Sequence, residues 1–192
     1  MQILVSFFCV HDVSAETQSC YIGSSIVRQN VAPRQGKTSM NKAGHHITSA
    51  ALAMAAWPAL SAQDPLSGAV AATGMLVGAS APDWLEGVVW LGDKRLSLLP
   101  HRTLTHWPVL WLICAVLTAI IWSGYTRTLG LGFIAGSLLH IAMDLGTPTG
   151  IPLLLPFGQR TTARLYTAGT LREGVLIGAW CLLCFGIFAL TT

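Results

Sequence analysis

Two long runs of apolar residues, neither of which contains a charged side chain, constrain the fold of this chain most. They are Trp107 to Tyr125 and Gly174 to Leu190. About 20 apolar residues of α-helix cross the roughly 30 Å of hydrocarbon in a bilayer. Because lipid offers no partners to backbone N–H and C=O groups, a single spanning segment must form a helix. We therefore expect both runs to be transmembrane helices.

Composition supports a membrane protein and extends this set of helices. Hydrophobic residues make up 53% of the 192 residues, charged residues only 10%, and the mean hydropathy is +0.59, which is outside the usual soluble range. Three further apolar segments run from Ile47 to Ala62, from Leu66 to Ala81 and from Leu129 to Leu145. The first two are rich in Ala and Gly, as is typical of helices that pack closely in a bundle. The sequence predicts an all-α, polytopic membrane helix bundle with about five transmembrane helices.

Two segments fall outside these helices. Residues 1–39 are mixed and polar after an apolar start, and we expect a disordered leader or a start codon assigned too far upstream, with a secretory signal as the alternative. Residues 40–192 then form one membrane-embedded domain. Between the second and third helices, residues 83–102 mix apolar and charged side chains and include Trp84 and Trp90, which is typical of a segment at the membrane interface.

The positions of Lys and Arg predict the orientation, because these residues collect in cytoplasmic loops. With a cytoplasmic amino terminus, ten of the eleven Lys and Arg residues lie on the cytoplasmic side and only Arg127 lies outside. The net charge of +3 is small, and the basic residues stand between apolar runs rather than in a block. We therefore expect membrane lipid, and no nucleic acid, as a partner.

Histidine and aspartate residues gather at the cytoplasmic ends of the predicted helices. His140 and Asp144 stand four residues apart and so share one face of the fourth helix. Burying such a pair costs free energy unless it is hydrogen-bonded or bound to a cation. Imidazole nitrogen and carboxylate oxygen are ligands of zinc and similar hydrolytic metals. A divalent metal site and a plain contact between helices both fit these two residues.

Four short motifs resemble the YdjM-like, LexA-regulated inner-membrane proteins, a family predicted to be metal-dependent hydrolases. They are AGHHITS (43–49), APDWLE (81–86), HRTLTHW (101–107) and HIAMDLGTPTGIPLLLPF (140–157). The resemblance implies a bacterial inner-membrane location and functional residues at His45, Asp83, His101, Arg102, Thr105, His106, His140 and Asp144, followed by a turn with Thr147, Pro148, Gly150 and Pro152. One departure stands out, since Leu85 replaces the second aspartate of the family's Pro-Asp-x-Asp motif and Glu86 follows it.

The resulting hypothesis is a phosphoester hydrolase with a divalent metal, zinc or alternatively manganese, that activates water for attack on a lipid or another amphiphilic substrate. Asp83, His106, His140 and Asp144 would hold one ion, and His45 would join Asp144 at a second. The order of these ligands is similar to that in zinc-dependent phospholipase C and related nucleases. His101 would be the acid for the leaving group or a ligand in place of His106.

Other readings of the same residues stay open. Arg102 would bind the substrate anion, or would only anchor the chain at the membrane interface. Thr105 would cap the third helix. The sequence does not decide between His45 and His46. A non-catalytic protein with a structural metal, or an electron-transfer protein whose haem is bound by His106 and His140, is the alternative to an enzyme.

Overall fold

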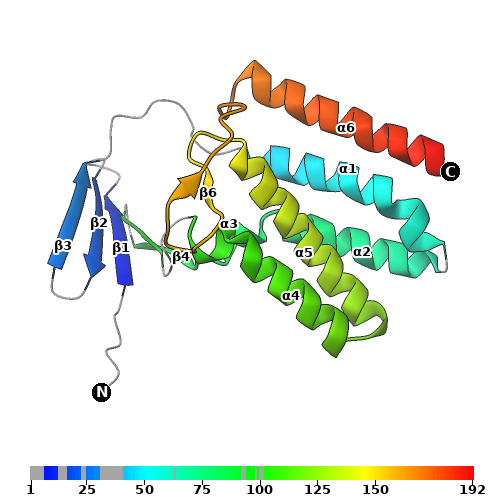
Figure 1. The fold of residues 1–192 in the computed structure, drawn as a ribbon, viewed down its shortest axis with the longest axis horizontal. Coiled ribbons are helices and arrows are strands. Elements are labelled where there is room, and N and C mark those ends of the chain that lie inside the picture. The colour runs from blue at the N-terminus through cyan, green and yellow to red at the C-terminus, as the bar shows by residue number, and fades with distance from the viewer. Residues whose placement is uncertain are drawn as a thin grey trace.

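The structure, a computed structural model, describes residues 7–12, 17–22, 25–30, 41–62, 64–91, 94–97, 99 and 102–192. Its body is helical and consists of α1 (Lys42–Ser61), α2 (Pro65–Gly78), the short α3 (Ala81–Trp84), the 3₁₀ turn η1 (Leu104–His106), α4 (Pro108–Ile121), α5 (Gly124–Leu145) and α6 (Leu171–Thr191). Figure 1 shows α6 lying along α1 at one edge of the body, and α5 lying between α4 and the pair α1 and α2.

Local sequence explains where α2 and α4 begin. The carboxylate of Asp64 accepts hydrogen bonds from the backbone N–H groups of Leu66 and Ser67 at the start of α2. Pro65 and Pro108 are the first residues of α2 and α4. A missing N–H is harmless at the first position of a helix, where it would have no partner within the helix.

Glycine residues bring the backbones of α2 and α5 into contact. Gly74 and Gly78 of α2 face Gly132 and Gly136 of α5, and the two glycines on each helix are four positions apart in the sequence. A Cβ atom at any of these positions would overlap the backbone of the facing helix, as at Gly136, where it would meet the carbonyl of Met75. The close packing by small residues that the sequence predicted for the second apolar segment is confirmed for α2, and its close partner is α5.

The five segments predicted to span the membrane all lie in helices, but their lengths differ. In the part of the chain that the structure describes, α5 and α6 are long and apolar enough to cross a membrane, by length and composition. The apolar helices α2 and α4 have 14 residues each, which is about 21 Å at 1.5 Å per residue. The ends of these two apolar runs fold as turns and caps, so the lengths do not support the prediction of five transmembrane helices.

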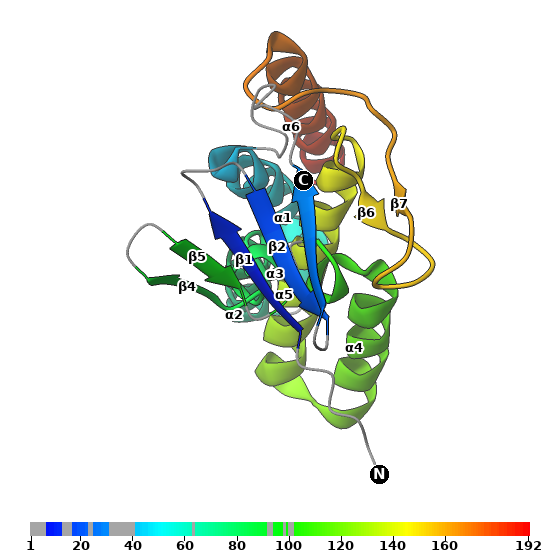
Figure 2. The same ribbon diagram turned by 90° about the vertical axis from the view of Figure 1, so that its left-hand side faces the viewer.

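The prediction of an all-α fold holds for the helical body and is wrong for a second part of the chain. Five antiparallel strands form a sheet in the order β3-β2-β1-β5-β4, built from β1 (Phe7–Asp12), β2 (Thr17–Ile22), β3 (Ser25–Asn30), β4 (Val88–Leu91) and β5 (Lys94–Ser97) (Figure 2). Three strands thus come from residues 1–39, and two from the segment expected at the membrane interface. Val88, Val89 and Trp90 favour a strand because β-branched and aromatic side chains suit a pleated surface.

A two-stranded hairpin follows α5 and covers its carboxyl end. β6 (Ile151–Pro152) pairs with β7 (Arg160–Thr161). Beyond β7, the N–H groups of Ala163 and Leu165 donate to the carbonyls of Leu145 and Gly146. Gly150 has a φ of +64°, and a Cβ there would meet the carbonyl of Thr161, so glycine is needed at this turn. The hairpin closes over the end of α5 that carries His140 and Asp144.

Candidate metal centre

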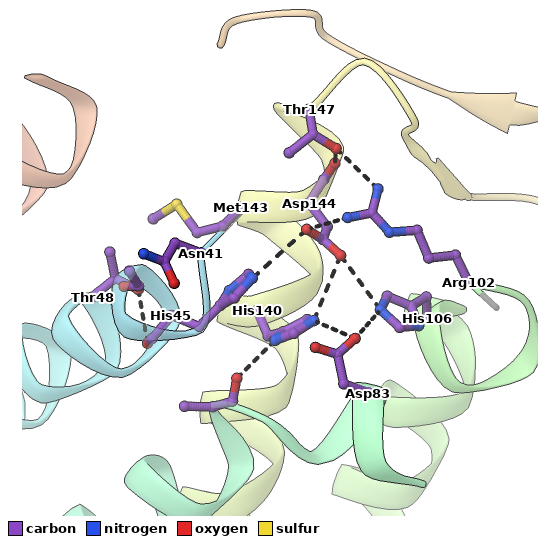
Figure 3. Close-up of polar contacts among 12 residues, drawn as sticks. Asn41, His45, Thr48, Asp83, Arg102, His106, His140, Met143, Asp144 and Thr147 are labelled. Carbon is purple, nitrogen blue, oxygen red and sulfur yellow. Dashed lines mark hydrogen bonds and ion pairs between the residues drawn. The ribbon is translucent and has the colours of Figure 1, made fainter. Parts of the chain in front are cut away.

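Residues from four separate segments meet at the end of the helical body nearest the hairpin. His45 comes from the first turns of α1, Asp83 from α3, His106 from η1, and His140 and Asp144 from the last turns of α5 (Figure 3). Among the described residues two groups could hold a metal ion, one of His45, His140 and Asp144 and one of Asp83, His106 and His140. His46, by contrast, is exposed, so the structure selects His45 from the pair.

The distances between the imidazole nitrogens and the carboxylate oxygens of this cluster are close to those between ligands of one metal ion. The Nε2 atom of His106 is 3.5 Å from Oδ1 of Asp83 and 3.4 Å from Oδ2 of Asp144. The Nε2 atom of His140 is 3.6 Å from each of the same two oxygens. Two ligands bound tetrahedrally to zinc at about 2.0–2.1 Å lie about 3.3–3.4 Å from each other. Asp83, His106 and His140 therefore suit one small divalent ion, and Oδ2 of Asp144 lies beside both imidazoles.

Hydrogen bonds fix which nitrogen of His140 faces this centre. Its Nδ1 atom lies 2.7 Å from the carbonyl oxygen of Ala79, at the end of α2. Because a carbonyl can only accept, Nδ1 carries the proton and donates it. In the neutral ring Nε2 then has a free lone pair, and this atom is buried without a hydrogen-bond partner among the described residues. A backbone carbonyl behind a ligating histidine is a common support for a metal ligand.

His106 is oriented in the same way by a different set of groups. Its Nδ1 atom is 3.4 Å from Oε1 of Glu86 and 3.1 Å from the hydroxyl of Thr105. Its Nε2 atom therefore points at Asp83 and Asp144. Thr105 is not the helix cap that the sequence suggested, since Trp107 precedes α4 and the carbonyl of Thr105 accepts from the indole N–H of Trp111.

Burial and neighbouring charges shift the pKa values of Asp83 and His106 in opposite directions. These two residues of the cluster lie outside the long helices. Burial raises the pKa of Asp83, but its contact with His106 and the charge on His140 outweigh burial and lower it to about 2. Burial lowers the pKa of His106, but contacts with Asp144 and Asp83 outweigh burial and raise it. The carboxylates thus attract a cation to Nε2 of His106, and a proton and a metal ion would compete for that position.

Arg102 lies inside this cluster. Its side chain is 1% exposed, and its NH2 atom is 2.6 Å from Oδ1 of Asp144. Its NH1 atom donates to the hydroxyl of Thr147, and its backbone N–H donates to Glu86. The backbone of Arg102 is left-handed, with a φ of 57°, a conformation that costs a non-glycine residue free energy. The burial of Arg102 and its pairing with Asp144 favour a role in the cluster over that of an interfacial anchor.

His45 contacts the cluster mainly through its ring. The ring stacks on that of His140, with centroids 3.8 Å apart and planes 16° from parallel. Its Nε2 atom is 3.8 Å from Oδ1 of Asp144, the oxygen that Arg102 already binds. His45 thus lies within reach of the metal centre and on the side occupied by the guanidinium.

Comparison with known families matches residues 40–191 to the model of the YdjM inner membrane proteins. The chain belongs to this family. Searches among curated proteins and among solved structures gave no match. Membership of the YdjM family and the two long apolar helices indicate a membrane protein.

The departure from the YdjM pattern at Leu85 has a structural counterpart in Glu86. Leu85 is 42% exposed, whereas Glu86 is fully buried and contacts His106 and Arg102. Glu86 is a site residue that the sequence analysis treated only as the next carboxylate along. The signal was its spacing of three from Asp83, which places both residues on one side of a helical turn.

Two predictions from the sequence remain, one for His101 and one for a haem between His106 and His140. His101, expected as an acid or a ligand, lies outside the described residues. A haem between His106 and His140 does not fit, because their rings meet edge to face with centroids 5.3 Å apart and Oδ1 of Asp83 contacts both. The donor set of two imidazoles and two carboxylates instead suits zinc or manganese.

Proposed function

We propose that this YdjM family member is a membrane-bound metal-dependent hydrolase that cleaves a phosphoester of a lipid or another amphiphile. The observation that carries the proposal is the placement of the Nε2 atoms of His106 and His140, each 3.4–3.6 Å from a carboxylate oxygen of Asp83 and of Asp144. The Nε2 atom of His140 is buried and makes no hydrogen bond among the described residues. A zinc or manganese ion held there would acidify a bound water, which is the usual source of a nucleophile in such enzymes.

Other residues of the chain orient the ligands or supply a proton. Ala79 and Glu86 keep the imidazoles of His140 and His106 turned toward the centre. Arg102 holds the carboxylate of Asp144 in place. His101, the neighbour of Arg102 in sequence, is the candidate acid for the leaving group.

The surroundings of Asp83 support an amphiphilic substrate. Its side chain is 36% exposed, whereas those of His106, His140 and Asp144 are at most 2% exposed, so among these four ligands Asp83 faces the way in. Next to it, Trp84 and Leu85 are 52% and 42% exposed. Exposed apolar side chains beside Asp83 suit a substrate that presents a phosphoester at the end of an apolar chain.

The proposal includes a multi-pass topology with the site at the cytoplasmic face. Exposed apolar side chains cover the outer face of α4, and of the 21 residues in α6 only Glu173 and Cys184 are buried, as expected of helices in contact with lipid. The charge bias of the loops favours a cytoplasmic amino terminus, and it does so without Arg102, which leaves nine cytoplasmic Lys and Arg residues against Arg127.

Metal content tests the proposal first. We would measure zinc and manganese by mass spectrometry in detergent-purified wild type, His140→Ala and Asp144→Ala, with His46→Ala as the matched control because His46 is exposed beside the cluster. We expect metal in the wild type and in His46→Ala and a loss of at least tenfold in the other two variants. A folded, metal-free wild type would leave a buried network of imidazoles and carboxylates, and the hydrolase proposal would fail.

Turnover is tested next on the same preparations. The substrates are a chromogenic phosphodiester, a chromogenic phosphomonoester and phosphatidic acid in mixed micelles. We expect release of product by the wild type and none by Asp144→Ala. Metal without turnover on any of these would favour the alternative, a membrane protein whose metal only braces the helices.

A further inference from the structure

The two oxygens of the Asp144 carboxylate face two different cations. Oδ2 lies 3.4 Å and 3.6 Å from the Nε2 atoms of His106 and His140, on the side of the proposed metal ion. Oδ1 lies 2.6 Å from NH2 of Arg102. In a two-metal hydrolytic site a bridging carboxylate binds one ion through each oxygen, and the ions stand about 3.5–4 Å apart. Here a guanidinium stands where the second ion would be bound.

Arg102 is held in this position at several points. Its NH1 atom donates to Thr147 at 3.0 Å and approaches the carbonyl of Gly150 at 3.4 Å, and its backbone N–H donates to Glu86 at 2.9 Å. Its Nε and NH2 atoms are buried and make no other hydrogen bond among the described residues. A divalent ion on Oδ1 of Asp144 would therefore be repelled by the positive charge of Arg102, which these contacts hold in place.

The charges around the centre disfavour a second ion. Asp83, Glu86 and Asp144 supply three negative charges, and Arg102 supplies a positive charge within the cluster. Arg160 adds another positive charge that acts on Arg102 and Glu86. A second divalent ion would therefore leave uncompensated positive charge in a largely buried site, which is costly.

We propose that Arg102 takes the place of the second metal ion, so that the centre binds one divalent ion per chain and His45 is not a ligand. His45 instead positions His140 by stacking on its ring. This inference rests on the proposed metal-dependent function and departs from the two-ion arrangement expected from the sequence. Arg102 supplies fixed positive charge beside the metal, the charge that a second ion provides in two-metal hydrolases.

The test is the number of zinc ions per chain, counted by mass spectrometry after equilibration with excess zinc and removal of free metal. We expect one equivalent in the wild type and one in His45→Phe, which keeps the stacked ring and removes both nitrogens. We expect two in Arg102→Ala, because Oδ1 of Asp144 and Nε2 of His45 become available, and one again in the double variant His45→Phe/Arg102→Ala.

The outcomes separate this inference from the proposed function. Two equivalents in the wild type, falling to one in His45→Phe, would overturn the role of Arg102 and leave a metal hydrolase standing. No zinc in the wild type would overturn both. If Arg102→Ala does not fold, the comparison of wild type with His45→Phe still tests the proposal. A one-ion centre in which His45 is not a ligand predicts the same number of zinc ions per chain in both proteins. An Arg102→Ala variant that folds and binds one ion would also contradict the proposal.

Discussion

At the scale of single residues, the site depends on groups behind the ligands as much as on the ligands. Nδ1 of His140 is tied to the carbonyl of Ala79, and Nδ1 of His106 faces Glu86. Supports of this kind fix the ring orientation and the tautomer before any metal binds. The carboxylate of Glu86 also accepts a hydrogen bond from the backbone N–H of Arg102. One buried side chain therefore positions both His106 and Arg102, which contact different oxygens of Asp144.

Replacing Glu86 by Gln should weaken zinc binding by about 10–100-fold, the usual cost of losing a carboxylate behind a histidine ligand. The amide keeps the size of the side chain and removes the negative charge beside Nδ1 of His106. The measurement is zinc affinity by titration against a chromogenic chelator. Leu85→Gln, an exposed change at the adjacent residue, is the control and should bind zinc as the wild type does. Equal affinities for the two variants would contradict the role given to Glu86.

At the scale of elements, the contact between α2 and α5 sets the geometry of the centre. Ala79 follows α2 and His140 lies on α5, and their hydrogen bond forms only if the two helices approach through their glycines. The hydroxyl of Ser137 adds a hydrogen bond to the carbonyl of Gly78 along the same seam.

Gly136→Ala should lower the stability of the protein by about 1–3 kcal/mol, because the added methyl group would overlap the carbonyl of Met75 and force the helices apart. Gly178→Ala on α6 is the control, since nothing lies within 4 Å of a Cβ there. That change should be neutral or stabilise by up to about 1 kcal/mol, because alanine favours a helix over glycine. The measurement is the midpoint of thermal unfolding in detergent, which should fall for Gly136→Ala and stay the same or rise for Gly178→Ala. An equal shift in both variants would contradict the close contact between α2 and α5.

The stabilisation that the hydrogen bond between Tyr125 and Asp64 gives at the start of α2 should depend on pH. The hydroxyl of Tyr125 donates to Asp64 at 2.8 Å, and this bond, followed by that from the Leu66 N–H, lowers the pKa of Asp64. A lowered pKa in the folded state gives stability that is present above the ordinary carboxyl pKa, about 3.9, and is lost as the pH falls through the lowered value. Tyr125→Phe should therefore reduce the unfolding midpoint at pH 7, with a difference from wild type that shrinks below about pH 4. A constant difference across this range would contradict the linkage to Asp64.

At the scale of the whole molecule, the helical body and the sheet divide the chain between two environments. The sheet lies beyond the end of the body that holds the candidate metal centre, and α4 and α6 lie along the body (Figure 1). Both helices expose many apolar side chains. In the proposed orientation the sheet and the site share the cytoplasmic side.

Reporter fusions should test how many helices cross the membrane. Fusions after Asp64, Gly87, Ser123, Gly169 and Thr192 should report outside, inside, outside, inside and outside in turn if all five helices span. Alkaline phosphatase is active only outside and green fluorescent protein fluoresces only inside, so each fusion point is read twice. If α5 and α6 alone span, the first three positions will report the same side, and the five-span topology will be wrong.

Much of this architecture could be predicted from local sequence. Apolar runs and Ala-rich segments produced helices at all five predicted places, because hydropathy and helix formation depend on neighbouring residues. The spacing of His140 and Asp144 also fixed their common face, since a helix repeats every 3.6 residues. The strands β4 and β5 were missed because a short mix of apolar and charged residues suits either a strand or an interfacial segment.

The sequence by itself determined the chemistry available to this protein: a membrane setting, and histidines with aspartates at the ends of helices. Only the tertiary structure decided which of them meet. It buried His45 and exposed His46, placed Glu86 behind His106, and set Arg102 on Asp144, 42 residues away along the chain. Such choices depend on the crossing of α2 with α5 and on the hairpin over the end of α5. Contacts between residues so far apart arise from packing, and no local pattern in the sequence encodes them.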